Sequence, residues 1–427
     1  MYHLGVGLPS RFAILGERPF RLLWLARSTS SIGDALVPVA TAFAVLDLGS
    51  ASDLGIVLAA YMGSRMIFIV AGGVWADRLP RQVVMIGSDV VRATTQGVVA
   101  ILFFTGSAEV WHLVISSAVF GCAAAFFGPA STGLVPTLVK PVHLQEANAL
   151  LGLSRNAIEV FGPAVSGLLV ATVGYEVVFA IDAASFVVSG LFLVAMRLPT
   201  ARPAREHTSF LADVKEGARE VASRTWLWAA FVSFALGNLA MAPYWVLGPL
   251  VAETELGGAR DWGLMMTGGA IGGVLGGAIA FRWKPDRPLL VSFPVMLVLP
   301  AALLALAVPL PLPLLIVGSM LLVVGIVLGN TLWQTVVQQE VPNEKLARVD
   351  ALDWMVSLVF MPAGYIAAGP LAEAIGVTQT LVLAAAIAIV AKLGILVVPS
   401  IRSMRRPESS SGDHEPQPEP TLVSAAH

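Results

Sequence analysis

Charge is scarce in this sequence. Asp, Glu, Lys and Arg make up only 13% of its 427 residues, whereas soluble domains typically carry about 25%. Hydrophobic residues make up 56%, and the mean hydropathy is +0.80. A chain with so few charges lacks the polar groups to cover a surface in water, so the composition indicates a protein embedded in lipid. The net charge of −2 hides strong local sorting and gives no indication of a nucleic-acid partner.

Cysteine and the common nucleotide motifs are also nearly or wholly missing. The single cysteine, Cys122, excludes a disulfide framework and a cysteine-based metal site. None of the five lysines is followed by Ser or Thr, so the sequence has no phosphate-binding loop, and it has no His-Glu-x-x-His zinc motif. We therefore expect no enzyme, no metal and no cofactor, and the sequence does not support ATP-driven pumping.

Long apolar runs are what the sequence has in quantity. Twelve windows approach the roughly 20 apolar residues that a membrane-crossing helix needs, six within 21–196 and six within 226–399. The polar connection 197–225 carries Phe210, Val214 and Val221 at helical spacing, which predicts an amphipathic helix on the membrane surface. The remaining segments are a short N-terminal stretch and a tail whose Pro, Ser and Glu content is typical of disorder, namely 1–20 and 400–427.

The basic residues sort to one side of these spans. If the N-terminus is cytoplasmic, 20 of the 26 Lys and Arg residues fall in cytoplasmic segments, and only Arg260 falls in an outer loop. A weak internal repeat begins at Pro141 and again at Pro342, at corresponding connections of the two sets of six. We therefore predict an all-α integral membrane protein with twelve transmembrane helices in two pseudo-symmetric six-helix bundles, with both termini cytoplasmic.

An acid and two arginines follow the second span, in "GVWADRLPRQ" from Gly73. Gly73 and Asp77 are four residues apart and share a helix face. An acid at a helix C-terminus is unfavourable unless a cation or the N-terminus of another helix lies close to it and compensates its charge. A glycine lets a neighbouring helix approach. Either this cluster contacts another element, or Arg78 and Arg81 only set the topology.

This cluster resembles the cytoplasmic loop signature of the major facilitator superfamily. The stretches "FRLLWLARSTSSIGDAL", "FFGPASTGLVPTLV", "ANALLGLSRNAIEVFGPAVSGLL" and "FAIDAASFVVSGLFL" resemble the branch that contains enterobactin exporters and macrolide-efflux proteins, and the likeness covers about 18–400. The resemblance implies alternating access and a monomer. It also implies that Gly73, Asp77, Arg78 and Arg81 form a latch between the two halves in the outward-facing state.

The fifth span carries a second likeness to that superfamily. Gly162, Pro163 and Gly167 match the glycine-proline core of its antiporters, although Ile158 and Ser166 depart from the pattern. The resemblance therefore favours an exporter-type antiporter. A Gly-Pro step could also be a helix kink and nothing more.

Ionisable residues at membrane depth are candidate functional sites. Asp34 in span 1 and Arg65 in span 2 have similar depth and could pair. Asp34 is the deepest carboxylate, so we expect it to carry the coupling proton. Arg27 lies nearer the cytoplasmic end and could simply extend its head group toward water.

Two further acids are coupling candidates with structural alternatives. Arg155 and Glu159 are one turn apart and can pair on their own helix. Asp182, early in span 6, matches an aspartate of the resembled family but could be a hydrated structural residue. In the second half no comparable acid lies in the middle of a span, since Asp350 and Asp353 fall near the start of span 11.

The second half offers polar and aromatic side chains instead of acids. Five of them are candidates for the wall of a cavity: Asn238, Trp245, Trp333, Gln334 and Trp354. Span 8 also has glycines at four-residue spacing from Gly268 to Gly276, which predicts close helix contact. That contact could be a moving interface or a static one.

These observations favour a proton-coupled exporter of small amphipathic compounds, such as drugs, antibiotics or siderophores, in a bacterial inner (plasma) membrane. Its partners would be its small-molecule substrate, protons and the bilayer. Two alternatives remain: an importer or facilitator of a small polar solute, and a non-transporting membrane receptor or assembly factor.

Overall fold

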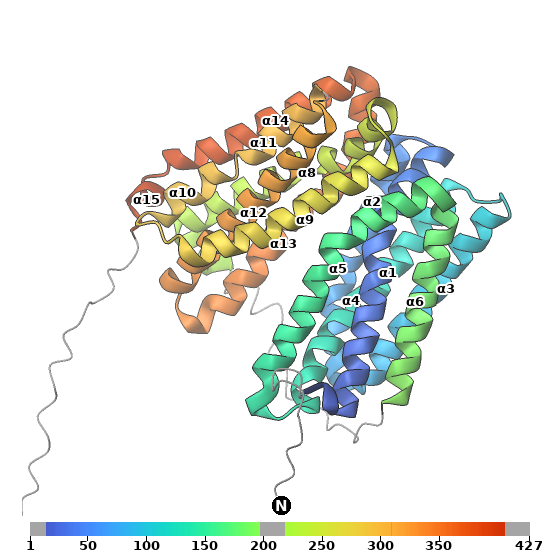
Figure 1. The fold of residues 1–427 in the computed structure, drawn as a ribbon. Helices are drawn as coiled ribbons and strands as arrows, with labels where there is room; N and C mark the ends of the chain where they lie inside the picture. Colours follow the sequence, from blue (N-terminus) through green and yellow to red (C-terminus); the bar gives the residue numbers. More distant parts are fainter. Residues whose placement is uncertain (1–13, 197–217, 309, 406–427) are drawn as a thin grey trace, which may run out of the picture.

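The computed structural model describes residues 14–196, 218–308 and 310–405. Every regular element in these ranges is helical, and the helices form two bundles (Figure 1). The first bundle contains α1 (Arg18–Leu48), α2 (Ala51–Arg78), α3 (Arg81–Phe104), α4 (Val110–Leu138), α5 (Leu144–Val173) and α6 (Tyr175–Ala195). The second contains α8 (Thr225–Glu255), α9 (Ala259–Arg282), α10 (Pro288–Val295), α11 (Val298–Ala307), α12 (Leu312–Glu340), α13 (Asn343–Ile375), α14 (Val377–Gly394) and the short α15 (Pro399–Ser403).

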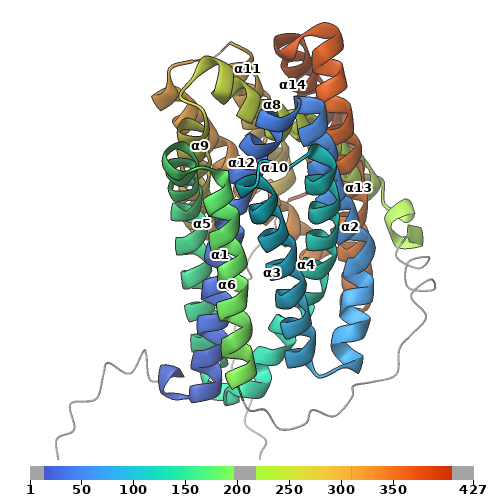
Figure 2. The ribbon, with the colours of Figure 1, turned by 90° about the vertical axis from the view of Figure 1, so that its right-hand side faces the viewer.

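Eleven segments of the described residues are long and apolar enough to cross a membrane. The helices α10 and α11 count as one segment, Pro288–Ala307, which is interrupted between Val295 and Val298. The helix α3 is not among the eleven, although it packs between α4 and α6 like a full member of the bundle (Figure 2). It carries the buried polar residues Asp89, Arg92 and Gln96, which lower its hydropathy.

The two bundles repeat one another. The contacts of α1 with α5 and α6 recur as contacts of α8 with α13 and α14, and the pairing of α2 with α4 recurs between α9 and α12. Both α5 and α13 contain an internal proline, Pro163 and Pro362 respectively. Both end at a glycine with positive φ, 88° at Gly174 and 97° at Gly376, and the next helix starts at once. Glycine adopts this backbone conformation without the steric cost that other residues incur.

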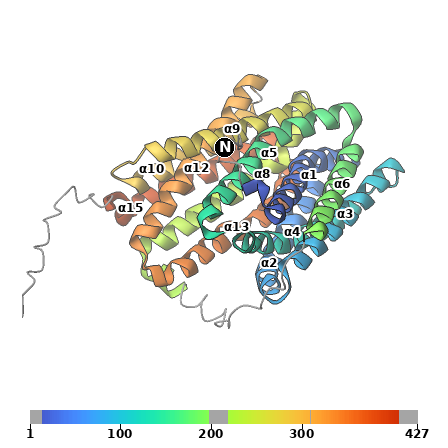
Figure 3. The same ribbon diagram turned by 60° about the horizontal axis from the view of Figure 1, so that its bottom comes forward.

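The bundles touch at one end and diverge at the other (Figure 1). We call the end where α1 begins the open end, and the end where α1 stops and α2 starts the closed end. One cluster of buried apolar residues runs through both bundles at the closed end. At the open end each bundle has a separate cluster, around Phe20 in the first and Trp333 in the second. Viewed from that end, the two sets of helices lie side by side (Figure 3).

Glycines make the contacts at the closed end. A side chain on Gly55 of α2 would meet the Tyr365 carbonyl of α13, and one on Gly369 would meet the Ser52 backbone. Ser52 Oγ also donates a hydrogen bond to Glu373 Oε1 at 2.5 Å. Small residues at such positions let helix backbones approach closely in lipid, so α2 and α13 form a tight seal.

The pairing of α5 with α9 forms the other half of this seal. A side chain on Gly167 would meet the Ala259 carbonyl, and one on Gly263 would meet the Pro163 carbonyl. The glycine stripe farther along α9 has a different role. Its members from Gly268 to Gly276 face α12 within the second bundle, so that contact lies inside one half.

Only the end of the connection between the halves falls in the described residues. Phe210 and Val214 lie outside them, while Val221 is buried against the second bundle. Next to it, Glu220 accepts hydrogen bonds from Lys345 Nζ at 2.7 Å and Arg224 Nε at 2.9 Å. The Lys345 ammonium, with a smaller contribution from Arg224, lowers the pKa of Glu220 below its usual value. This segment is therefore pinned to the start of α13.

Candidate transport cavity

A cavity of about 730 Å³ lies between the bundles, a volume within the range of small-molecule sites. Most of its lining comes from the first bundle, and Trp245, Met361 and Tyr365 come from the second. Trp245 is thus the one second-half candidate on this wall. The other four line a separate, smaller pocket described below.

The cavity wall carries more basic than acidic side chains. In the described part of the chain, its charged residues are four arginines and two carboxylates: Arg27, Arg65, Arg92, Arg155, Asp34 and Glu159. The predicted pair within α5 is formed, with Arg155 Nε 2.6 Å from Glu159 Oε1. Both side chains are more than half exposed, so the pair faces the cavity. The other arginines leave the wall with an excess of positive charge.

Asp34 pairs with an arginine that the sequence did not indicate. Its Oδ2 lies 3.4 Å from Arg92 Nη1 on α3, and its side chain is 41% exposed. The expected pair with Arg65 is not formed. Arg65 Nη1 instead donates to the Tyr61 hydroxyl at 3.3 Å, one turn away on the same helix. Similar depth in two helices does not ensure contact, because their rotations decide which faces meet.

Arg92 extends the charge network into the protein interior. Its Nη2 lies 2.6 Å from Asp89 Oδ1, and Ser189 Oγ of α6 donates to Asp89 Oδ2 at 2.7 Å. The guanidinium also lies 4.2 Å from the centre of the Phe186 ring, a cation–π contact. A chain of contacts therefore joins α1, α3 and α6 through Asp34, Arg92 and Asp89. The sequence signal for it is an acid and a base three residues apart within one apolar run.

Asp182 lies next to this network but is shielded from water. It is fully buried, and neither of its carboxyl oxygens has a hydrogen-bond partner among the described groups. Gly33 of α1 makes room for it, since a side chain there would meet Asp182 Oδ1. This burial does not favour the alternative of a hydrated residue. Packing of α6 onto α1 removes it from solvent.

The glycine-proline motif of α5 lies where three helices meet. A side chain on Gly162 would come within 2.5 Å of the Ala35 Cβ on α1, whereas Pro163 and Gly167 face α9. The motif thus packs α5 against its own bundle and against the other one. Its place at the closed-end seal is a more specific role than a kink alone.

The predicted latch is only partly visible. The helix α2 continues through Gly73, Asp77 and Arg78, but their side chains lie outside the described part of the structure. Arg81 Nη1 donates a hydrogen bond to the Gly133 carbonyl of α4. This contact ties the start of α3 to its own bundle, and the latch remains a prediction.

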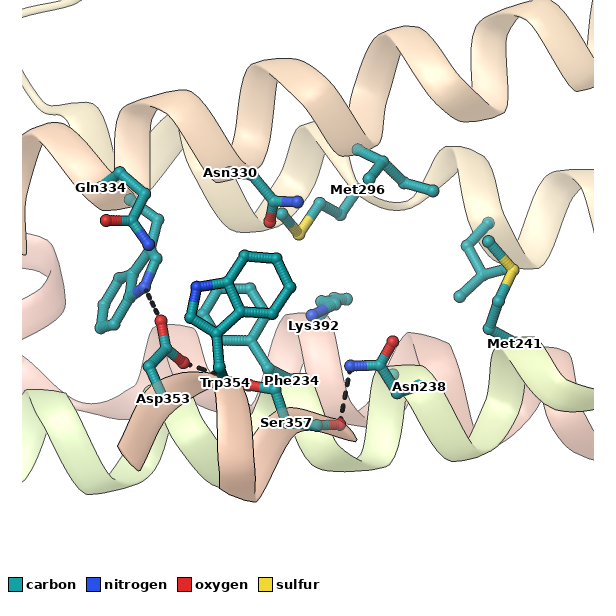
Figure 4. A pocket seen from close by; sticks show the side chains of 14 residues that line it. Phe234, Asn238, Met241, Met296, Asn330, Gln334, Asp353, Trp354, Ser357 and Lys392 are labelled. Atoms are coloured by element: carbon teal, nitrogen blue, oxygen red, sulfur yellow. Dashed lines mark hydrogen bonds between the residues drawn. The ribbon is translucent and has the colours of Figure 1, made fainter. Parts of the chain in front are cut away.

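A second, smaller pocket of about 230 Å³ lies within the second bundle (Figure 4). Its lining includes four of the five second-half candidates: Asn238, Trp333, Gln334 and Trp354. Trp333 Nε1 donates to Asp353 Oδ2 at 2.7 Å, and Asn238 Nδ2 donates to the Ser357 carbonyl at 2.9 Å. The second half does therefore place a buried acid at a cavity. Asp353 is only 8% exposed although it lies near the start of its span.

Lys392 of α14 also lines this pocket, and sequence reasoning missed it as a site residue. The sequence alone places it only at or near the end of the last span. The structure instead buries it within the bundle, at 3% exposure.

Two helical bundles around a charged cavity define a multi-span membrane transporter. The sequence profile of the transmembrane secretion effectors matches residues 9–426. The chain belongs to that family, in the major facilitator superfamily. It is a multi-pass protein of the bacterial plasma membrane, and it is a transporter and not an enzyme.

Efflux proteins are among the relatives. The chain is 28% identical over 384 residues to the multidrug efflux pump Tap of Mycolicibacterium fortuitum, covering 85% of this chain and 91% of the relative. It is 24% identical to macrolide efflux protein A of Streptococcus pyogenes, covering 91% and 96%. An uncharacterized MFS-type transporter of Bacillus subtilis (strain 168), YfiS, is 28% identical over 207 residues, which are 47% of this chain and 48% of the relative.

The fold is that of solved transporters. A crystal structure of a bacterial homologue of the iron transporter ferroportin, in an inward-facing state, superposes with a TM-score of 0.68. The superposition covers 91% of this chain and 99% of the other, at 17% sequence identity. At this identity the likeness shows the fold alone.

Proposed function

We propose that the protein exports small amphipathic compounds, of the drug, antibiotic or siderophore type, by proton antiport with alternating access. The observation that carries this proposal is the central cavity, which holds the accessible carboxylate Asp34 and is sealed at one end by glycine contacts. The efflux relatives support the direction of transport.

The orientation follows from the charge bias. Adding α3 to the eleven apolar segments gives twelve spans. An even number of spans puts both termini on the same side, which is the cytoplasm if the open end is cytoplasmic. The bundles then present their cavity to the cytoplasm, where an exporter collects its substrate. The outward-facing state would require the α2–α13 and α5–α9 contacts to part and the open end to close. The cluster of Gly73, Asp77, Arg78 and Arg81 is our proposed contact for that second state.

The charge network supplies a proton-coupling device. Asp34 is exposed to the cavity, and Arg92 links it to Asp89 in the interior. Proton binding at Asp34 removes its attraction to Arg92 and so alters the contacts between α1 and α3. Asp182 and Glu159 are the alternative candidates for binding the coupling proton. Asp182 is unpartnered, and burying an unpaired charge is far more costly than burying a neutral group.

The test is dye uptake into inverted vesicles under an imposed proton gradient, comparing wild type with Asp34→Asn. We expect the variant to lose gradient-driven accumulation but to keep dye exchange down a dye gradient, because only the proton site is removed. Asp53→Asn is the matched control. Its carboxylate bonds Ser50 at the start of α2, outside the cavity lining.

The other outcomes are equally informative. Normal gradient-driven transport by Asp34→Asn would move the coupling site to Asp182 or Glu159. A rate of dye uptake that is the same with and without the proton gradient would indicate a facilitator. A wild type that moves no compound at all, but retains a protein partner through purification, would indicate a receptor or assembly factor.

A further inference from the structure

The small pocket of the second bundle has room for one chemical group of a ligand. Five helices converge on it: α8, α11, α12, α13 and α14. Its volume of about 230 Å³ is below the roughly 300–1,000 Å³ typical of drug-sized sites. Amides and a hydroxyl lie on its wall beside tryptophans, from Asn238, Asn330, Gln334, Ser357, Trp333 and Trp354 (Figure 4). Such a site suits one head group of a larger compound.

The cation of this pocket is buried without an acidic partner. Lys392 Nζ donates one hydrogen bond, to the Ser233 carbonyl at 3.3 Å, although an ammonium group has three donors. It lies 4.5 Å from the centre of the Phe234 ring. Among the described residues, no carboxylate lies within ion-pairing distance of it. Two donors of Lys392 thus remain for another group.

The acid of the pocket is already engaged. Asp353 Oδ2 accepts from Trp333 Nε1, and its Oδ1 accepts from Ser357 Oγ at 3.1 Å. Asp353 is thus oriented by neutral donors, and it forms no ion pair with Lys392.

A glycine makes space for the ammonium group. A Cβ on Gly237 of α8 would lie 3.2 Å from Lys392 Nζ and 3.3 Å from its Cε, which is tighter than an ordinary contact. Glycine at this position lets the charged end of Lys392 lie against α8 beside the pocket.

The central cavity has the same sign of charge, with four arginines and two carboxylates on its wall. An unpaired buried cation is costly, and an anionic ligand group would remove that cost. We propose that the small pocket is a subsite for an anionic oxygen group, such as a carboxylate, of the transported compound, held by Lys392. This inference rests on the proposed function and narrows its substrate class to anionic or zwitterionic amphipathic compounds.

The test uses fluorescein and rhodamine 123, two dyes with the same xanthene ring system and opposite charge. Their binding to the purified full-length protein in detergent is measured by fluorescence polarisation. We expect wild type to bind fluorescein more tightly than rhodamine 123. Lys392→Met keeps the volume of the side chain but removes its charge, and should weaken fluorescein binding about tenfold, as expected for one charge-assisted hydrogen bond.

The controls separate this subsite from the central cavity. Lys392→Arg keeps the charge and should retain most of the affinity for fluorescein. Arg65→Gln removes an exposed charge of the central cavity and should cost less than Lys392→Met. Equal losses for Arg65→Gln and Lys392→Met, or no loss for Lys392→Met, would overturn the subsite.

A folding defect is distinguishable from the loss of the subsite. Unchanged rhodamine 123 binding by Lys392→Met shows that the protein is folded. If that variant does not fold, Trp354→Ala serves instead. Trp354 lines the pocket and is 64% exposed, so its truncation should weaken fluorescein binding and leave stability intact. Equal fluorescein binding by Trp354→Ala and wild type would overturn the subsite.

Transport of the same dyes distinguishes the two proposals. If cells extrude rhodamine 123 but not fluorescein, the exporter stands and the anionic subsite falls. If the purified protein binds fluorescein through Lys392 but cells extrude neither dye, the subsite stands and the dye-exporter proposal falls.

Discussion

Arg92 holds two carboxylates at once, one facing the cavity and one buried. Asp89 is 1% exposed and Arg92 is 2% exposed, so this pair is removed from water, whereas Asp34 remains accessible. Removing one partner of a buried pair is more destabilising than the pair is stabilising, because it leaves an uncompensated charge. The energetic role of Arg92 is therefore concentrated on Asp89, and its role toward Asp34 is to position it.

We therefore predict that Arg92→Met lowers the free energy of unfolding by about 3 kcal/mol, the cost of a broken buried pair. Denaturant titration of the purified protein in detergent measures it. Arg65→Met is the matched control and should change stability by less than about 1 kcal/mol, since exposed charges contribute little. The double variant Asp89→Asn with Arg92→Met should recover part of the loss. Equal stability of Arg92→Met and Arg65→Met would show that the buried pair is not needed.

Residue-level expectations succeeded where both partners lie on one helix. The pair of Arg155 and Glu159 follows from their spacing alone and is present. The predicted partner of Asp34, Arg65, was wrong. The actual partner depends on how α1, α2 and α3 are rotated against each other. The burial of Asp182 and Lys392 was missed for the same reason. A polar residue in an apolar run signals importance, but the packing of other helices decides what it contacts.

At the scale of the element, the seal between the bundles depends on glycines, whose lack of a side chain lets two helices touch. Gly55 and Gly369 serve the α2–α13 contact, and Gly167 and Gly263 serve the α5–α9 contact. The seal has to be tight in one state and open in another, and glycine contacts allow both because they interlock no side chains. Gly318 offers a comparison, since a Cβ there would meet nothing within 4 Å.

We predict that Gly263→Leu shifts the protein away from the closed-end-sealed state. Overpacking of a tight contact costs about 1–3 kcal/mol, enough to change the ratio of two states about tenfold. Maleimide labelling of a Ser31→Cys reporter on the cavity wall, in a Cys122→Ser background and inverted vesicles, should slow accordingly. Gly318→Leu should label like the parent. Unchanged labelling in Gly263→Leu would mean that α5 and α9 separate without affecting access to the cavity.

Across the whole molecule, the sequence predicted an all-helical membrane protein, and the described residues form helices and no strands. It did not predict the sign of the charge on the cavity wall. Eleven spans follow from length and hydropathy, because lipid demands long apolar helices. The helix α3 falls short because it carries Asp89, Arg92 and Gln96, which lower its hydropathy although they are buried inside the bundle. Which end is sealed was not predictable, since alternating states share one sequence and differ only in contacts between the halves.

Transport by alternating access requires the closed end to open. Ser52 of α2 and Glu373 of α13 meet across the two bundles at that end. We expect a short bis-methanethiosulfonate linker between Ser52→Cys and Glu373→Cys, in a Cys122→Ser background, to stop dye export while leaving a Ser31→Cys reporter in the cavity reactive from the open end. A reducing agent should restore export, and each single-cysteine variant should export normally with the linker present. Export at full rate by the crosslinked protein would show that its substrate leaves by a route other than the α2–α13 seal, because a rigid pair of bundles joined there has no second access state.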